Sequence, residues 1–168
     1  MDRPLPNLPY TETKRLRLRP LRLSDAEAFR AMTDEPAVID AIYFLERPFG
    51  LADAEKLIAS DSNGRDCFWG VWKREGPTLL GTVGTHLKGT KEIEVGYWFA
   101  SASQGLGLAS EAVTGVMLVL LDNYPERRII AECRPENEAS WRLLERVGFR
   151  ADDAGDARPG RQRFIFVR

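Results

Sequence analysis

The chain has 168 residues, 43% of them hydrophobic, and its 24 basic and 25 acidic side chains leave a net charge of -1. This length and apolar content suffice for one domain with a buried core, and the balanced charge gives no reason to expect nucleic acid or an anionic membrane as the main partner. The longest apolar run, 116–121, is far shorter than the roughly 18 residues that span a bilayer.

The N-terminus and the cysteines indicate which cellular compartment to expect for the protein. "MDRPLPNLPY" lacks the apolar core of a signal peptide. Cys67 and Cys133 lie far apart and match no zinc or disulfide pattern. We therefore expect a soluble, cytoplasmic protein with two reduced core cysteines and no metal site. No linker or repeat divides the chain, which predicts one domain over residues 1–168 with an extended N-terminal arm over residues 1–12.

The first predicted elements are a strand and two helices. "KRLRLRPL" (14–21) alternates apolar and basic residues, which predicts a strand with one solvated face. Ser24 and Glu27 have the spacing of a capping box, which predicts the start of a helix that ends or kinks at Pro36. "LADAEKLIAS" (51–60) predicts a second, short amphipathic helix.

Three strands in a meander are predicted next, over residues 66–73, 78–87 and 91–99. The first two are joined by a turn that contains Gly76 and Pro77. Such short connections predict antiparallel pairing.

A long helix is predicted from Leu106 to about Asn123, where apolar residues follow helical spacing. Leu118, Val119 and Leu121 make its last turns apolar on all sides, so we expect this helix to be deeply buried.

The remaining segments predict strand, helix and strand. "RRIIAEC" (127–133) is a short buried strand, and "RQRFIFVR" (161–168) alternates as a closing strand. Between them, Asn137 is a good N-cap and Gly148 is placed to end the helix. The crossover through the long helix predicts one parallel strand pair. The order is typical of a mixed α/β or α+β domain.

The glycines of "SQGLGLAS" (103–110) lie between the third meander strand and the long helix. The first N–H groups of a helix are unpaired, and with the helix dipole they bind anions. Gly105 and Gly107 leave room for such a ligand, although glycines that only shape a turn are the alternative. No P-loop motif is present, and Ser110 stands where a dinucleotide fingerprint needs its third glycine.

Three segments in this order resemble the GNAT superfamily of N-acetyltransferases. Gln104, Gly107 and Ala109 match its central motif, R/Q-x-x-G-x-G/A. "NEASWRLLERVGF" is similar to N-x-x-S-x-x-x-L-E-K-x-G-F of the branch that acetylates N-termini of ribosomal proteins, with Arg146 in place of the usual Lys. "TETKRLRLRPLRLSDAEAF" resembles the opening of that branch.

The resemblance implies a GNAT fold, in which helices flank a mixed, mostly antiparallel sheet that splays near its middle. It implies acetyl-CoA as co-substrate, with its pyrophosphate on the backbone of 104–109 and its pantetheine arm beside 97–100. The residues expected to contact acetyl-CoA are Tyr97, Trp98, Phe99, Ala100, Gln104, Gly105, Leu106, Gly107, Leu108, Ala109, Ser110, Asn137 and Ser140.

Acetyl transfer needs a neutral amine and a stabilised leaving thiolate. Glu94 is the candidate for removing the proton, directly or through water; an exposed strand carboxylate is the alternative. The resemblance gives Ser140 the thiolate end, with an ordinary first-turn serine as the alternative. His86, the only histidine, has the chemistry of a base, but its place at a strand end favours a surface or loop position.

The acceptor is left open by the sequence. An α-amine is roughly 10–17% neutral at pH 7 and a lysine amine roughly 0.04%, so a protein N-terminal α-amine needs the least help. The alternatives are a small-molecule amine and a non-catalytic acyl-CoA-binding module. A polycationic acceptor calls for an acidic pocket. The candidate acids for it are Asp34, Glu35, Asp40 and Glu46, with solvated loop charges as the favoured alternative. The segment 151–163 identifies no substrate, and a homodimer is consistent with the family.

Overall fold

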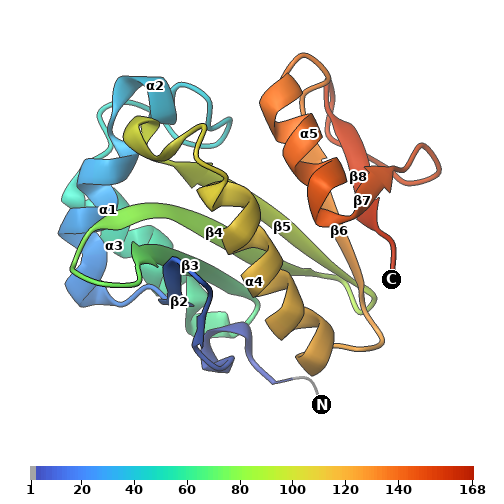
Figure 1. Cartoon of the computed structure of the whole chain (residues 1–168), viewed down its shortest axis with the longest axis horizontal. Coiled ribbons are helices and arrows are strands. Elements are labelled where there is room, and N and C mark those ends of the chain that lie inside the picture. The colour runs from blue at the N-terminus through green and yellow to red at the C-terminus, as the bar shows by residue number, and fades with distance from the viewer. Residues whose placement is uncertain (1–2) are drawn as a thin grey trace.

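One mixed sheet of eight strands organises the fold, in the order β1-β2-β3-β4-β5-β6-β8-β7 (Figure 1). The computed structural model describes residues 3–168, and of residues 61 and 62 only the backbone. The strands are β1 Thr11–Glu12, β2 Leu16–Pro20, β3 Asp66–Lys73, β4 Leu79–Lys88, β5 Glu92–Phe99, β6 Arg128–Cys133, β7 Phe149–Ala151 and β8 Gln162–Phe166.

The α-helices are α1 Ala26–Thr33, α2 Pro36–Ile39, α3 Leu51–Ala59, α4 Leu108–Asn123 and α5 Glu138–Val147. Short 3-10 turns occupy Leu5–Asn7, Leu23–Asp25, Ser60–Asn63 and Ser101–Ser103. In the part of the chain that the structure describes, no helix is long and apolar enough to cross a membrane.

The pairing of the strands confirms the predicted fold class. Every neighbouring pair is antiparallel except β5 and β6, which are parallel and joined through α4. The meander of β3, β4 and β5 and the parallel crossover are both as predicted. The short strands β1 and β7 were not predicted, because two or three residues carry too little alternation to be recognised.

The sheet opens between β5 and β6. These strands pair only from Glu92 to Glu94 on β5 and from Arg128 to Ile130 on β6, whereas β5 stays paired with β4 as far as Phe99. No strand of the described chain therefore pairs with the β6-facing edge of residues 95–99. Such an edge is able to accept another extended chain.

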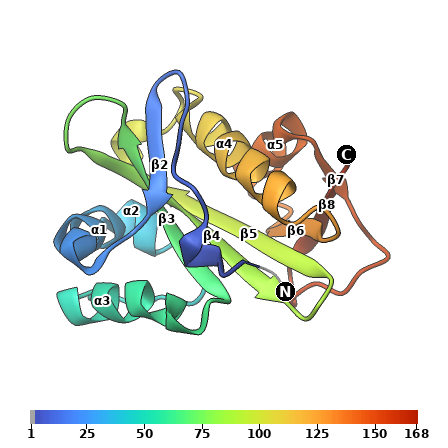
Figure 2. The same ribbon diagram turned by 90° about the horizontal axis from the view of Figure 1, so that it is seen from below.

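Different helices cover the two faces of the sheet. α4 lies across one face (Figure 2), where Val116 shares a core cluster with Ile93 and Val95 of β5. α1 and α3 cover the other face, where Phe29 packs with Trp98. Because successive residues of a strand point to opposite faces, β5 contributes side chains to both cores.

Two glycines in the left-handed region set the ends of the helices that flank the opening. Gly107, with φ +75°, is the N-cap of α4, and Gly148, with φ +118°, ends α5. Asn137 caps the start of α5 as predicted, since its side chain accepts a hydrogen bond from the Ser140 N–H at 3.1 Å.

The predicted capping box at Ser24 is wrong. α1 begins at Ala26 after a 3-10 turn, and Asp25 makes the local contacts instead. Its carboxylate accepts the Arg22 N–H at 2.7 Å and pairs with Arg19 at 2.8 Å. A carboxylate held by two donors is favoured over a serine hydroxyl at this position.

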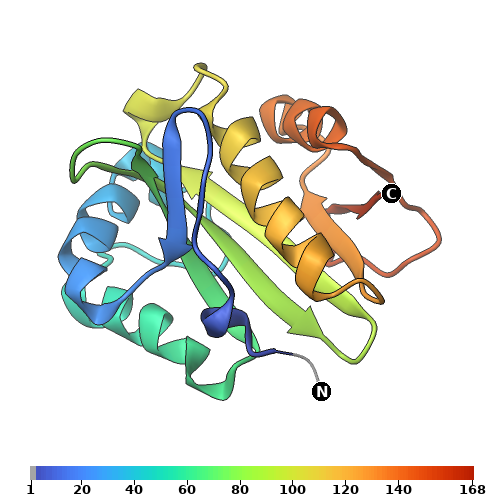
Figure 3. The ribbon, with the colours of Figure 1, turned by 60° about the horizontal axis from the view of Figure 1, so that its bottom comes forward.

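Two further segments differ from expectation. Leu118 is 59% exposed, so the last turns of α4 are buried on one side only, because α4 lies on the surface of the sheet (Figure 3) and not between layers. The N-terminal arm contains the 3-10 turn Leu5–Asn7 and buries Leu5 and Leu8. Residues 1 and 2 of that predicted arm lie outside the described residues.

Candidate active site

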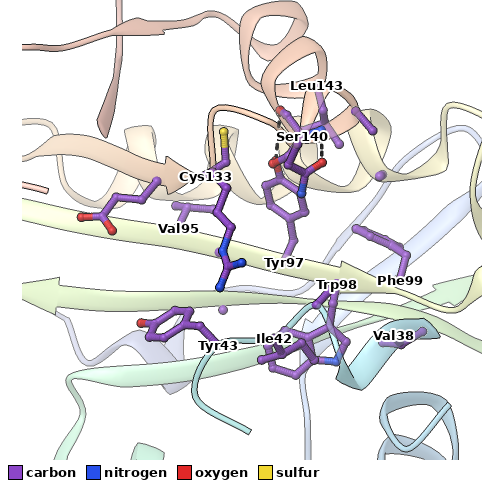
Figure 4. Close-up of a pocket in the computed structure, with 18 of the residues that line it drawn as sticks. Val38, Ile42, Tyr43, Val95, Tyr97, Trp98, Phe99, Cys133, Ser140 and Leu143 are labelled. Carbon is purple, nitrogen blue, oxygen red and sulfur yellow. Dashed lines mark hydrogen bonds between the residues drawn. The ribbon is translucent and has the colours of Figure 1, made fainter. Parts of the chain in front are cut away.

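A cavity of about 930 Å³ lies where β5 and β6 separate. Figure 4 shows that it reaches both sides of β5: Tyr97 points toward Ser140 of α5, whereas Trp98 points the other way, toward Ile42 and Tyr43. The opening in the sheet thus connects two compartments, one beside α4 and α5 and one beside α1 and α2.

The first compartment ends at the N-terminus of α4. Gly105 and Gly107 both have positive φ, +77° and +75°, and both line the cavity. A Cβ placed on Gly105 would meet no atom within 4 Å. A Cβ placed on Gly107 would lie 3.5 Å from Arg15 Nη2. The loop therefore presents backbone N–H groups at the end of a sixteen-residue helix with a cationic side chain beside them, which is an arrangement that binds phosphates.

Basic side chains line the same cavity, and one of them contacts the loop. Arg134, Arg142 and Arg146 line the cavity, and Arg146 Nη1 donates to Ser110 Oγ at 3.3 Å. None of the three was predicted to contact the ligand, although Arg146 was named as a position of the second motif. The spacing of four residues between Arg142 and Arg146, which puts both on one face of a helix, is a signal that could have found those two.

Most of the residues predicted to contact acetyl-CoA line this cavity; the two that do not are Ala100 and Leu106. The Ala100 N–H donates to the Leu80 carbonyl at 2.9 Å, away from the cavity. The Leu106 side chain is 58% exposed, and its carbonyl accepts a hydrogen bond from Arg15 at 2.9 Å.

Two hydroxyl groups meet at the opening. Tyr97 Oη and Ser140 Oγ are 2.6 Å apart. Burial raises the pKa of the Tyr97 phenol well above its usual range, and the hydrogen bond with Ser140 offsets only part of this. Tyr97 therefore keeps its proton at neutral pH, and its hydroxyl is able to donate a hydrogen bond to Ser140.

Glu94 is held by two cations. Its carboxylate accepts from Arg158 at 2.5 and 3.0 Å and pairs with Lys88 at 3.0 Å. Burial raises the pKa of Glu94, but the hydrogen bonds from Arg158 and Lys88 outweigh it and bring the pKa to about 2. A carboxylate with this pKa is a very weak base. The geometry therefore argues against Glu94 as the group that removes a proton, and equally against an exposed strand carboxylate.

His86 lies in the cavity and not in a surface loop. β4 runs to Lys88, so His86 is inside the strand and faces Asp66 across the pair β3–β4. Its Nδ1 is 2.8 Å from Asp66 Oδ1, and its ring packs edge-on against Phe68 with centroids 5.5 Å apart. The sequence could not show this, because the register between the two strands is set by the sheet.

The second compartment has aromatic walls and balanced charges. Tyr43 and Phe44 are half-exposed at its mouth, and the guanidinium of Arg161 lies 4.9 Å from the Tyr43 ring. Glu132 also lines it and pairs with Arg158 at 2.8 Å and with Arg161 at 3.4 Å. Glu132, like Glu94, thus has two cationic partners.

The candidate acids do not form an acidic pocket. The candidate acids Asp34, Glu35, Asp40 and Glu46 do not line the cavity. Asp40 pairs with Arg47 at 2.7 Å, and Asp34 accepts the Phe49 N–H at 2.9 Å. These charges are used locally or are solvated, as loop charges usually are.

The cysteines and the side chains that commonly bind metals form no further site among the described residues. Cys67 and Cys133 are both buried, and within the described residues neither forms a disulfide. With the side chains of residues 61 and 62 left aside, residues 3–168 contain no group of three or more His, Cys, Asp or Glu side chains placed to hold a metal ion.

Comparison with known proteins gives one family. Residues 15–150 match the model of the acetyltransferase (GNAT) domain. The uncharacterized N-acetyltransferase YoaA of Bacillus subtilis (strain 168) is 33% identical over 150 residues, which cover 86% of this chain and 84% of YoaA.

Solved structures share the fold. An acetyltransferase of the GNAT family from Bacillus anthracis superposes with a TM-score of 0.80 at 22% identity, covering 95% of this chain and 98% of that one. The ribosomal L7/L12 alpha-N-protein acetyltransferase RimL, solved in complex with coenzyme A, superposes with a TM-score of 0.78 at 17% identity, covering 94% and 96%.

The ion pairs of Glu94 with Arg158 and Lys88 predict that the stability of the fold depends on pH. Because the pKa of Glu94 falls from its usual 4.5 to about 2 on folding, the carboxylate stabilises the fold above pH 4.5, and this contribution is lost as the pH falls toward 2. In urea unfolding, the advantage of the wild type over Glu94→Gln should be largest near pH 6–7 and shrink between pH 4.5 and 2. Glu138→Gln, which removes a solvent-exposed pair with Arg142, is the control and should cost little at any pH. A loss of unfolding free energy in Glu94→Gln that stays constant down to pH 2 would contradict a stabilising role of these ion pairs.

Proposed function

The chain belongs to the GNAT acetyltransferase family, and we propose that it transfers the acetyl group of acetyl-CoA directly to a single primary amine, such as the α-amine of a protein N-terminus. The observation that carries this proposal is the cavity through the opening of the sheet. It gives two substrates access to one place from opposite faces of β5, so no covalent intermediate on the protein is needed.

The first compartment fits coenzyme A. A pyrophosphate needs backbone N–H groups without an obstructing side chain, and the loop 104–110 supplies them at the N-terminus of α4. Arg134, Arg142 and Arg146 add positive charge around it. The amides of a pantetheine arm need an extended backbone with free groups, which the unpaired edge of residues 95–99 offers.

Ser140 and Tyr97 fit the leaving-group end. Ser140 lies in the first turn of α5, where the helix dipole favours a nearby negative charge. Its hydroxyl is able to give a proton to a leaving thiolate, and Tyr97 at 2.6 Å is able to replace that proton. This hydroxyl pair at the opening supports an enzyme over a non-catalytic acyl-CoA-binding module.

The second compartment fits an acceptor with one amine. The carboxylates Glu94 and Glu132 are paired with Lys88, Arg158 and Arg161, and Asp66 is bonded to His86, so each of these carboxylates already has a partner and none is free to bind a polycation. Aromatic rings at the mouth favour apolar groups beside the amine. This disfavours polyamines and aminoglycosides. RimL is named for α-N acetylation of a protein, which agrees with an α-amine acceptor.

The rest of the chain belongs to the same unit. The arm before residue 15 and the strand β8 lie outside the matched segment, but Leu5, Leu8 and Phe164 are buried in the core that contains α4. This supports one acetyltransferase domain over the whole chain.

Replacing Gly107 tests the donor site. Gly107→Glu puts a carboxylate at the expected place of the pyrophosphate, and we expect acetyl-CoA affinity in calorimetry to fall at least about 100-fold. Gly76→Glu is the matched control. Gly76 also has positive φ, +91°, a Cβ placed on it would meet no atom within 4 Å, and it does not line the cavity. Both variants carry a similar backbone cost of about 1–2 kcal/mol, but only Gly107→Glu should lose binding. Equal affinities would remove the donor site from this loop.

Replacing Ser140 tests the leaving-group end. Ser140→Ala should lower kcat about 10–100-fold in a thiol-release assay, because the proton donor is lost, while acetyl-CoA affinity changes less than threefold. Ser140→Thr keeps a hydroxyl and should retain more activity than Ser140→Ala. If Ser140→Ala keeps wild-type kcat, the serine only shapes the first turn of α5.

The acceptor is tested by a thiol-release screen of four amine classes at pH 7. We expect kcat/KM to be highest for peptides with a free N-terminus, lower for N-terminally blocked peptides with a lysine, and lowest for spermidine and aminoglycosides, because of amine pKa and pocket charge. A preference for the polycations would overturn the proposed acceptor. Absence of thiol release with every amine would overturn the proposed activity.

A further inference from the structure

We propose that His86, oriented by Asp66, is the base that takes the proton from the acceptor amine, and that this amine lies over the paired glycines Gly84 and Gly96. The proposal rests on the proposed transfer to an amine and adds a residue and a place to it.

The floor of the second compartment lacks side chains. Gly84 of β4 and Gly96 of β5 are direct cross-strand partners, and both line the cavity. A Cβ placed on Gly96 would meet no atom within 4 Å, so the space above it is open. Gly96 also lies two residues beyond Glu94, where β5 loses β6 as a neighbour. The hollow over this pair, the glycine floor, therefore adjoins the edge proposed for the pantetheine arm.

The side chain of His86 leans over this floor. A Cβ placed on Gly84 would lie 2.9 Å from His86 Nε2 and 3.3 Å from the Phe68 ring. The Asp66 carboxylate can only accept, so Nδ1 carries the hydrogen in the contact at 2.8 Å. In the neutral ring this leaves the lone pair on Nε2, and no residue that the structure describes is hydrogen-bonded to Nε2.

The neighbouring ionisable groups are less suited to the task. Glu94, across from His86 on β5, is held by Arg158 and Lys88 and is a very weak base. Tyr97 keeps its proton and points to the opposite face of β5. Imidazole exchanges protons near neutral pH, and a carboxylate on its other nitrogen stabilises the imidazolium that forms.

The protons of the reaction balance with these side chains and solvent. Nε2 takes one proton from the ammonium of the acceptor, which becomes a neutral amine, and His86 becomes an imidazolium paired with Asp66. As the C–N bond to the acetyl carbon forms, the C–S bond breaks and sulfur leaves with its electron pair. Ser140, resupplied by Tyr97, protonates the thiolate. The nitrogen loses its second proton to solvent, solvent restores the proton of the hydroxyl pair, and His86 returns its own proton to solvent.

Kinetics of four variants test this assignment with the acceptor that the wild type uses best. His86→Gln and His86→Ala should lower kcat about 100-fold, with acetyl-CoA affinity in calorimetry within threefold of wild type. Asp66→Asn, which leaves the base but removes its orienting carboxylate, should lower kcat less. Glu94→Gln should lower kcat less than tenfold.

Rescue by added imidazole separates a chemical role from a structural one. Imidazole should raise the rate of His86→Ala at least fivefold in proportion to its concentration, because it fits the space left above Gly84. It should not raise the rate of the wild type or of Ser140→Ala. A kcat of His86→Gln within threefold of wild type, or His86→Ala without rescue in a folded protein, would overturn the assignment.

The place of the amine has its own variant. Gly96→Ala puts a Cβ over the glycine floor, where it meets no atom within 4 Å, and should raise KM for the amine at least tenfold, a larger change than in acetyl-CoA affinity. An unchanged KM would overturn the placement. These failures differ from that of the proposed function, in which the wild type itself releases no thiol with any amine.

Discussion

The early separation of β5 from β6 is the constraint on which the site depends. Parallel pairing stops after Glu94 and Ile130, while β4 continues to hold β5 to Phe99. Burying a strand edge whose backbone groups lack hydrogen-bond partners costs free energy. The unpaired edge of β5 lies beside a cavity instead. Tyr97 and Ser140 bridge the gap and hold α5 against β5 at the point where the strands part. Both substrates can then meet at one place from opposite faces.

Ion pairs fix the second compartment and also set its chemistry. Arg158 joins Glu94 of β5 to Glu132 of β6, and so ties the segment between β7 and β8 across the two strands that separate. The same contacts leave Glu94 too weakly basic for proton transfer. The ion pairs that order this segment thereby disfavour Glu94 as the base. In our proposal the base is instead His86, which lies one strand away and is bonded to the carboxylate of Asp66.

Local patterns predicted the elements and drew attention to the glycines before α4, because these depend on residues close in sequence. The meander, the crossover, the cap at Asn137 and the glycines before α4 are all read within short windows. What was missed depends on distant pairing. His86 meets Asp66 only through the register of β3 and β4, and Glu94 meets Arg158 across 64 positions of the chain. The exposure of Leu118 likewise follows from where α4 lies on the sheet.

Amide hydrogen exchange with and without coenzyme A tests the central claim most directly. If the unpaired edge of β5 holds the pantetheine arm, coenzyme A should slow exchange of the amides in 95–99 that face the opening, together with those of the loop 104–110, and leave α3 unchanged. Protection of the loop 104–110 with no change in 95–99 would show that the ligand does not enter the opening of the sheet, and would contradict the account.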